Sequence, residues 1–242
     1  MSDSAIAIST YITDSAKEYR TKYLQTCVTT LIKSKFDGQI FIVDDCSPNR
    51  EHIDWLKNLG YPNLTVYERS ENGGIAKTKN TSIRLCIESG SKYFFLSDDD
   101  MYFKKENWWK HYEHACRGSK VPHFSFTATG AVVRSRHPKT INGFELTKTS
   151  LVDGCFLFCK RELIDLIGYF VIMPTKYGHE HSNFSVRAQK YCGGFFDLNN
   201  SMDLVGLYEL SSSHKSVNVT TKDVNANAQY VHKFLDNQPC IE

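Results

Sequence analysis

Short apolar segments alternate with amphipathic helical segments over the first hundred residues, and this alternation restricts the fold more than any other feature. The strand-like segments are residues 5–11, 39–43, 64–67 and 93–96. Between the first two, Leu24, Val28 and Leu31 recur at the spacing of one helix face. Because alternating strands and helices form βαβ units, we expect an α/β fold with a Rossmann-like, mostly parallel sheet in the first half.

The regular alternation of strand-like and helical segments ends after about residue 120. The segments expected there are strands at 122–127, 131–134 and 150–159, a helix from Lys160, and a helix from about Glu180 to Gly193. No linker-like composition and no internal repeat divides the chain. Residues 1–242 are therefore predicted to form one domain whose second half is mixed α/β.

The chain of 242 residues is 41% hydrophobic and 23% charged, which is typical of a folded globular protein. The formal net charge of +2 is too small to produce a positive electrostatic field that attracts nucleic-acid phosphates, which argues against a nucleic-acid partner. No apolar run approaches the roughly 18 residues of a transmembrane segment, and the first residues lack the features of a signal peptide. The eight cysteines form no CxxC pair, so we expect free thiols and a cytoplasmic protein.

Three consecutive carboxylates, Asp98, Asp99 and Asp100, follow the fourth strand-like segment. Such close like charges repel each other unless a cation lies among them, and Mg²⁺ or Mn²⁺ takes carboxylate oxygens. Because alternate residues of an extended chain share a side, Asp98 and Asp100 are expected to converge while Asp99 points elsewhere. The alternative is a solvated acidic turn, but α/β sheets bind ligands at the carboxyl ends of strands, which favours the metal site.

A second acidic pair, Asp44 and Asp45, ends the second strand-like segment, and Glu71-Asn72-Gly73-Gly74 precedes a helix. Each motif alone is also typical of an ordinary turn or helix cap. Lys77 and Lys79 lie in the first turns of that helix. Their ammonium groups favour an interaction with a diphosphate or a nucleobase oxygen.

Taken in order along the chain, these motifs resemble the signature of family 2 glycosyltransferases of the GT-A fold. The matching segments are Ser9-Thr10-Tyr11, Val43-Asp44-Asp45-Cys46-Ser47, Glu71-Asn72-Gly73-Gly74 with Lys79-Asn80, and Ser97-Asp98-Asp99-Asp100. The usual family residues are P-T-Y, V-D-D-G-S, E-N-x-G followed by R-N, and D-x-D. Ser9, Cys46 and Lys79 depart from that pattern.

The resemblance implies that residues 1–120 bind a nucleotide sugar and that residues 121–242 form the acceptor side. The implied donor contacts are Ser9, Thr10, Tyr11, Asp44, Asp45, Asn72, Gly73, Lys79, Asp98 and Asp99. Asp45 would hold the nucleoside with Ser9 or Tyr11, while Asp98 and Asp100 with Mn²⁺ or Mg²⁺ would hold the diphosphate. His214 is implied as a further metal ligand, although its polar surroundings suit a surface histidine equally well.

Residues 177–184 (YGHEHSNF) are similar to the family's Y-G-x-E-D-x-x-F segment, in which the Asp is commonly the catalytic base. His181 occupies that position and Glu180 precedes it. Adjacent residues at a helix start point about 100 degrees apart, so we expect only one of the two to face the sugar. Glu180 is the expected base, because a carboxylate also stabilises positive charge on the donor sugar; alternatively, Glu180 only caps the helix.

The resemblance implies a metal-dependent transferase that moves a sugar from a nucleotide diphosphate donor, preferably a UDP-sugar, to a hydroxyl of a glycan or glycoconjugate, with inversion. One rival is a phosphoryl or nucleotidyl transferase, but the chain lacks the G-x-x-x-x-G-K-[ST] phosphate loop that would favour it. The other rival is a catalytically silent sugar-binding domain of the same fold. Trp108 and Trp109 are expected in the core rather than on a sugar-stacking surface.

Overall fold

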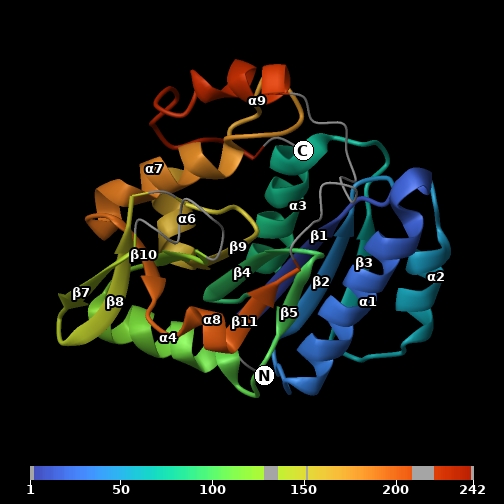
Figure 1. The fold of residues 1–242 in the computed structure, drawn as a ribbon, viewed down its shortest axis with the longest axis horizontal. Helices are drawn as coiled ribbons and strands as arrows, with labels where there is room; N and C mark the ends of the chain where they lie inside the picture. The colour runs from blue at the N-terminus through green and yellow to red at the C-terminus, as the bar shows by residue number, and fades with distance from the viewer. Residues whose placement is uncertain (1–2, 128–135, 151, 209–220, 241–242) are drawn as a thin grey trace.

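A six-stranded sheet forms the centre of the protein, as the computed structural model shows (Figure 1). The structure describes residues 3–127, 136–150, 152–208 and 221–240. In sheet order, the strands are β3 (Leu64–Glu68), β2 (Gln39–Asp44), β1 (Ser4–Thr10), β4 (Tyr93–Asp98), β9 (Phe156–Lys160) and β6 (His123–Ser125). The first four are parallel, whereas β9 is antiparallel to β4 and β6. The predicted α/β class, with a mostly parallel first half and a mixed second half, is confirmed.

Helices cover both faces of this sheet. Buried side chains of α1 (Lys17–Lys33), α2 (Glu51–Asn58) and α4 (Trp108–Ser119) share one hydrophobic core, and those of α3 (Gly74–Glu88), α6 (Arg161–Ile167) and α7 (Glu180–Cys192) share the other. In β1, Ile6 and Ile8 belong to the first core, and Ala5 and Ala7 belong to the second. Strands that are buried on both faces carry continuous apolar runs, as β1 does.

The remaining elements lie mostly in the second half. They are η1 (Asp14–Ala16), β5 (Met101–Phe103), β7 (His137–Ile141), β8 (Phe144–Thr149), β10 (Phe195–Leu198), α8 (Ser201–Leu204), β11 (Val205–Leu207) and α9 (Thr221–Ala228). Strands β10, β8 and β7 form one small antiparallel sheet, and β11 pairs with β5. The expected strand at 131–134 and the expected ligand His214 lie outside the described residues.

Two tryptophans at the start of α4 lie in the first core, as predicted. Trp108 and Trp109 are 0% and 1% exposed. The ring of Trp108 stacks on Phe103 and Phe36, and its indole N–H donates to Ser34 Oγ at 3.1 Å. These contacts explain why the aromatic pair contributes to packing rather than to a ligand platform.

The parallel strands end in register at one edge of the sheet. Thr10 at the end of β1 lies opposite Asp44 on β2, and Ser9 lies opposite Asp98 on β4. The polar motifs that follow these strands are therefore brought to the same edge, as the rule for open α/β sheets requires. None of the helices in the described part of the chain has the length and hydropathy needed to cross a bilayer. All eight cysteines are described, and none forms a disulfide.

Candidate functional site

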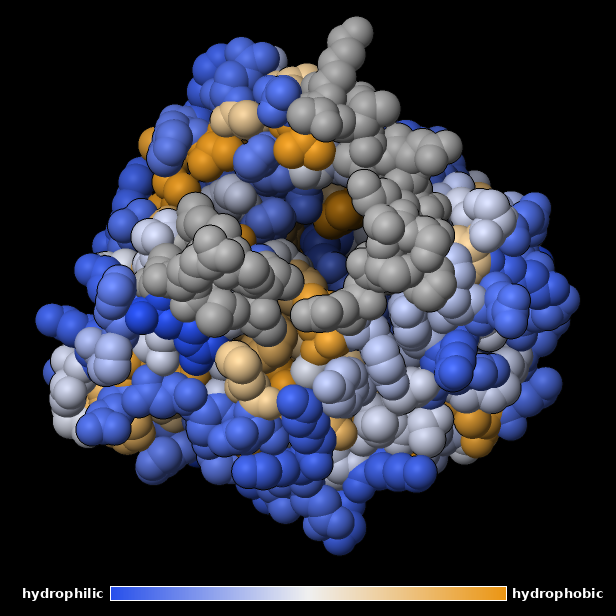
Figure 2. All heavy atoms as spheres, viewed as in Figure 1, coloured by the Kyte–Doolittle hydropathy of each residue, from blue (hydrophilic) through white to orange (hydrophobic). Residues whose placement is uncertain are grey.

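A cavity of about 510 Å³ opens at this edge of the sheet. Figure 2 shows the hollow near the centre of the face. The sequence-predicted residues that line it are Ser9, Thr10, Tyr11, Asp45, Lys79, Asp98, Asp100, Glu180 and His181. Arg20, Ile75, Thr78 and Phe170, which the sequence did not single out, line it as well. The cavity thus joins the first-half motifs to the start of α7.

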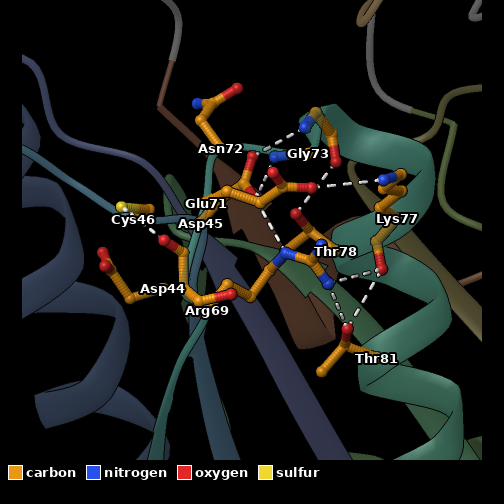
Figure 3. Close-up of polar contacts among 12 residues, drawn as sticks. Asp44, Asp45, Cys46, Arg69, Glu71, Asn72, Gly73, Lys77, Thr78 and Thr81 are labelled. Carbon is orange, nitrogen blue, oxygen red and sulfur yellow. Dashed lines mark hydrogen bonds and ion pairs between the residues drawn. The ribbon is translucent and has the colours of Figure 1, made fainter. Parts of the chain in front are cut away.

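Asp45 anchors the loop that begins α3 (Figure 3). Its carboxylate accepts hydrogen bonds from the backbone N–H groups of Gly73 and Gly74, each at 2.9 Å, and pairs with Arg69 Nε at 3.0 Å. Burial raises the pKa of Asp45, and these hydrogen bonds oppose that rise. The Thr78 side chain also hydrogen-bonds to this carboxylate, whereas Arg69 Nε pairs with it by charge without a hydrogen bond, so hydrogen bonds engage three of its about four acceptor positions.

Close approach and a positive φ require glycine at position 74, whereas at position 73 a Cβ would meet only side chains. A Cβ on Gly73 would lie 2.7 Å from the Arg69 guanidinium, and one on Gly74, whose φ is +78°, would lie 2.8 Å from the carbonyl oxygen of Lys176. Neither Gly73 nor Asn72 lines the cavity. Asn72 instead accepts from Lys176 Nζ through both its main-chain and side-chain oxygens, each at 2.9 Å. Asn72 and Gly73, which were expected at the donor, are therefore placed in the scaffold that shapes the cavity.

Two other carboxylates that were expected at the donor also lie behind the cavity wall. Asp44 and Asp99 are both 0% exposed, and neither lines the cavity. Asp44 accepts from the backbone N–H of Ser47 at 2.9 Å and contacts His52 Nε2 at 3.0 Å, so it fixes the turn after β2. Asp99 accepts from Thr10 Oγ1 at 2.6 Å and pairs with Arg20. Their acceptor atoms are engaged within the protein, and neither carboxylate faces the cavity.

Two basic side chains of the protein pair with the acidic cluster, which consists of Asp98, Asp99 and Asp100. Lys79 Nζ donates to Asp98 Oδ1 at 2.7 Å, and Arg20 bridges Asp99 and Asp100, the latter at 3.2 Å. Burial disfavours the charge of Arg20, but the two carboxylates outweigh it and raise the pKa of the guanidinium. The predicted repulsion among the three aspartates is therefore partly relieved by side chains. Arg20 was missed, although a charged residue four positions before Leu24, on the inner face of α1, was a readable signal.

Two residues that line the cavity carry buried side-chain oxygens without hydrogen-bond partners. Ser9 Oγ and Asp100 Oδ1 find no hydrogen-bond partner among the described residues. Burial raises the pKa of Asp100 to about 7, against the lowering effect of Arg20. Such unmatched oxygens in a cavity are suited to an outside cation or donor.

The described residues hold no group of three or more His, Cys, Asp and Glu side chains that could bind a metal ion. Asp98 and Asp100 nevertheless line one cavity, and the free oxygen of Asp100 fits a cation whose other ligands come from a diphosphate.

Glu180 and His181 form a hydrogen-bonded pair at the start of α7. Both line the cavity, with His181 Nδ1 lying 3.3 Å from Glu180 Oε1. Both side chains therefore line the cavity although adjacent helical residues point about 100 degrees apart, and which of them faces the sugar stays a prediction. Just before the helix, Gly178 and His179 adopt φ values of +101° and +66°.

The environment of this pair lowers the pKa of Glu180 and raises that of His181. Burial raises the pKa of Glu180, but the hydrogen bond and charge of His181 bring it below its ordinary value. Burial lowers the pKa of His181, but Glu180 outweighs burial and raises it. Gly154 makes room for the imidazole, because a Cβ there would lie 2.6 Å from Cγ and Nδ1 of His181.

Several solved structures have a fold similar to that of this chain. S. aureus TarS 1-349 in complex with UDP-GlcNAc has a TM-score of 0.65 at 15% identity, covering 96% of this chain and 65% of that one. GalNAc-T7 with UDP, GalNAc and Mn²⁺ has a TM-score of 0.63 at 16% identity, covering 87% and 45%. The mannosyltransferase PcManGT of Pyrobaculum calidifontis, in complex with GDP-Man and Mn²⁺, has a TM-score of 0.60 at 14% identity, covering 88% and 59%. The fold is therefore of the GT-A type, and the chain spans less than two thirds of each of these structures.

Sequence comparison identifies the family. The model described as Glycosyl transferase family 2 matches residues 12–179. A relative described as "Uncharacterized glycosyltransferase R363" of Acanthamoeba polyphaga mimivirus is 31% identical over 246 residues, which cover 98% of this chain and 95% of the relative. The chain belongs to glycosyl transferase family 2, and the predicted resemblance is confirmed.

Proposed function

We propose that this enzyme transfers a sugar from a nucleotide diphosphate donor, preferably a UDP-sugar, to a hydroxyl of a glycan or glycoconjugate, with a divalent metal ion and with inversion. One observation carries the proposal. A single cavity brings together the strand-end residues Ser9 and Tyr11, the carboxylates Asp98 and Asp100, and the acid–base pair at the start of α7. A nucleoside, a diphosphate and a reacting sugar need these three kinds of site in this order.

The nucleoside lies at the end of the cavity formed by Ser9, Tyr11 and Asp45. Ser9 Oγ is buried and has no partner in the described part of the chain, so it is available to a ligand. The remaining acceptor position of Asp45 suits the N3–H donor of uracil, which supports a uridine preference. The solved structures with this fold include complexes with UDP and with GDP-Man, so the base preference needs its own test.

The diphosphate lies against Asp98 and Asp100, with Mn²⁺ or Mg²⁺ between. When bound, the ion would act as a Lewis acid that stabilises the negative charge of the leaving diphosphate. Lys79 and Arg20 supply fixed positive charge on the protein side of these carboxylates. Complexes of two proteins of this fold contain Mn²⁺, which supports the assignment. His214 remains the proposed further ligand.

The geometry of the acid–base pair supports His181 rather than Glu180 as the base that deprotonates the acceptor. A carboxylate only accepts hydrogen bonds, so the Glu180 contact requires the proton of the neutral imidazole on Nδ1 and leaves a lone pair on Nε2. None of the described residues forms a hydrogen bond with Nε2 of His181. The side chain of His181 is 25% exposed, against 6% for that of Glu180. Glu180 orients the ring and stabilises the imidazolium that forms.

The proposed reaction is a single displacement at the anomeric carbon of the donor sugar. Nε2 of His181 takes the proton of the acceptor hydroxyl while the acceptor oxygen forms a bond to the anomeric carbon. The bond from that carbon to the diphosphate oxygen breaks, and its electron pair leaves with the nucleotide. Attack from the face opposite the leaving group gives inversion.

Product analysis tests this function against its rivals. With a panel of nucleotide sugars and Mn²⁺, we expect slow release of free sugar and UDP without acceptor, and faster UDP release when the right glycan is added. Pyrophosphate as the product would instead identify a nucleotidyl transferase. A protein that binds sugar nucleotides but releases neither product would be a silent domain.

Matched variants test the base. His181→Asn and Glu180→Gln are compared with His179→Asn, which alters a neighbouring histidine that does not line the cavity and whose left-handed backbone Asn tolerates. We expect His181→Asn to lose transfer by about 100-fold or more with donor affinity intact. His179→Asn should stay close to wild type. Normal transfer by His181→Asn would overturn the assignment.

We also propose the cytosol as the location. Eight cysteines form no disulfide, and four of them, Cys27, Cys86, Cys116 and Cys159, are buried, which suits a reducing compartment.

A further inference from the structure

The C-terminal segment, residues 224–238, packs against the cavity wall through two buried asparagines. It includes most of α9, which Figure 1 shows beyond one end of α3 and α7. Asn227 belongs to α9 and Asn183 to α7, and both are 0% exposed. A fully buried amide must satisfy its donors and its acceptor inside the protein. The hydrogen-bond partners of each amide therefore show which segment of the chain that amide holds in place.

Asn227 holds the loop that leads into α7. Its Nδ2 donates to the main-chain oxygens of Thr175 at 3.2 Å, Tyr177 at 2.9 Å and Gly178 at 2.9 Å. Its Oδ1 accepts from the backbone N–H of Thr175 at 3.1 Å. One side chain from residue 227 thus satisfies four main-chain groups of the loop 175–178. None of these bonds goes to a core side chain, so the contact controls the path of the loop.

Asn183 makes the reciprocal contact from α7. Its Nδ2 donates to the main-chain oxygens of Tyr230, Val231 and Lys233, the last at 2.7 Å. Its Oδ1 accepts from Arg187 Nε at 3.0 Å. The helix that carries the acid–base pair fixes the C-terminal segment, and that segment fixes the loop before the same helix.

The loop needs such support because of its conformation and its position. Tyr177 and Gly178 line the cavity, and a hydrogen bond joins the Tyr177 side chain to that of Asn72. Gly178 and then His179 adopt left-handed φ values in succession, and His179 does so with a side chain present. The start of α7 follows immediately, with Glu180 and His181. A shift of this loop would move both the wall of the cavity and the acid–base pair.

We propose that Asn227 is a positioning residue of the active site, through which the C-terminal segment holds the loop 175–178 and the start of α7 in the geometry that binds donor and acceptor. This inference rests on the proposed transferase function. Asn227 touches no ligand; it acts through Tyr177, Gly178 and the pair that follows them.

Asn227→Asp tests the inference with a matched control on the same helix. Aspartate keeps the shape of the amide but places acceptor oxygens against three main-chain oxygens. Asn225→Asp makes the same chemical change at an exposed position of α9. The readouts are hydrogen exchange of amides 175–181 by mass spectrometry, affinity for UDP by calorimetry, and transfer rate, all at a temperature where each variant is folded.

We expect Asn227→Asp to exchange amides 175–181 about tenfold faster or more, to bind UDP about tenfold more weakly, and to lose transfer by at least as much. Asn225→Asp should match wild type in all three. In a cycle with Tyr177→Ala, the two losses of UDP affinity should be less than additive, because both act through Tyr177; a purely global loss of stability would not couple them.

Several outcomes would overturn the proposal. Unchanged exchange at 175–181 in folded Asn227→Asp would show that the amide does not hold the loop. Faster exchange with wild-type UDP affinity and transfer would show that the loop does not position the site. If Asn227→Asp does not fold, Asn227→Ala replaces it, and failure of both to fold would make Asn227 a general determinant of stability instead. Absence of any nucleotide binding by the wild type would count against the proposed function, whereas the exchange result judges the contact itself.

Discussion

Asp45→Asn is expected to destabilise the protein as well as to weaken nucleotide binding. The carboxylate of Asp45 is 4% exposed and accepts from the backbone N–H groups of Gly73 and Gly74 while it pairs with Arg69. The amide of Asn keeps only one acceptor oxygen. Its NH₂ group must then face either a backbone N–H or the guanidinium, donor against donor, and the charge that compensates Arg69 is lost.

The expected loss in the free energy of unfolding is about 3 kcal/mol. A hydrogen bond to a charged acceptor contributes about 1.5–3 kcal/mol, and removing one partner of a buried ion pair costs about 3–5 kcal/mol. The second figure is reduced here because Arg69 keeps other partners, donating to Thr81 Oγ1 at 2.6 Å and to the carbonyl oxygen of Lys77 at 3.5 Å. For a chain of this size, about 3 kcal/mol corresponds to a drop in melting temperature of about 6–12 °C.

Thermal unfolding followed by circular dichroism measures this drop. Asp54→Asn is the matched control, because Asp54 is exposed on α2 and its loss should change stability by about 0.5 kcal/mol or less. A cooperative transition of Asp45→Asn within 2 °C of wild type would refute the view that Asp45 holds the start of α3. UDP affinity should fall as well, and GDP should then compete more evenly with UDP.

Three further predictions concern the acidic cluster and the base. Gly154→Ala places a Cβ against the His181 ring and should lower the transfer rate by about 10–100-fold with UDP affinity unchanged; equal kcat would contradict the packing. Because the pKa of His181 is raised and the base must be neutral, transfer should increase as pH rises through a value above 6.5, and a flat profile would exclude the imidazole. Asp99→Ala removes one of the two buried carboxylates that pair with Arg20; because Asp100 remains at 3.2 Å, the cost in a denaturation experiment should be about 3 kcal/mol, the low end for a broken buried ion pair, whereas Asp100→Ala should mainly weaken metal-assisted UDP binding.

Local patterns in the sequence were sufficient for the central sheet. The apolar runs of β1, β2 and β4 and the helical spacing of Leu24, Val28 and Leu31 reflect burial, which each segment encodes by itself. The sequence also predicted the acidic motifs at the strand ends correctly, because each motif directly follows an apolar run. One readable signal was overlooked: Asn142-Gly143, with φ values of 49° and 81°, is the two-residue turn of the β7–β8 hairpin.

The missed parts of the site depend on contacts between distant segments. Arg20 reaches Asp99 and Asp100 because α1 packs against β5, which follows these two residues directly. The pairing of β5 with β11 joins residues about a hundred positions apart, and no local pattern specifies such a partner. Glu180 and His181 both line the cavity, which side-chain spacing on an ideal helix does not reveal.

Calorimetric titration of UDP, first with Mn²⁺ and then with EDTA, tests the central claim most directly, because the diphosphate is proposed to bind through an ion held by Asp98 and Asp100. We predict that UDP binds with Mn²⁺ and that EDTA weakens its affinity by about tenfold or more, with little further effect of EDTA on Asp100→Ala. Equal affinity for UDP in Mn²⁺ and in EDTA would contradict metal-assisted donor binding at this cavity.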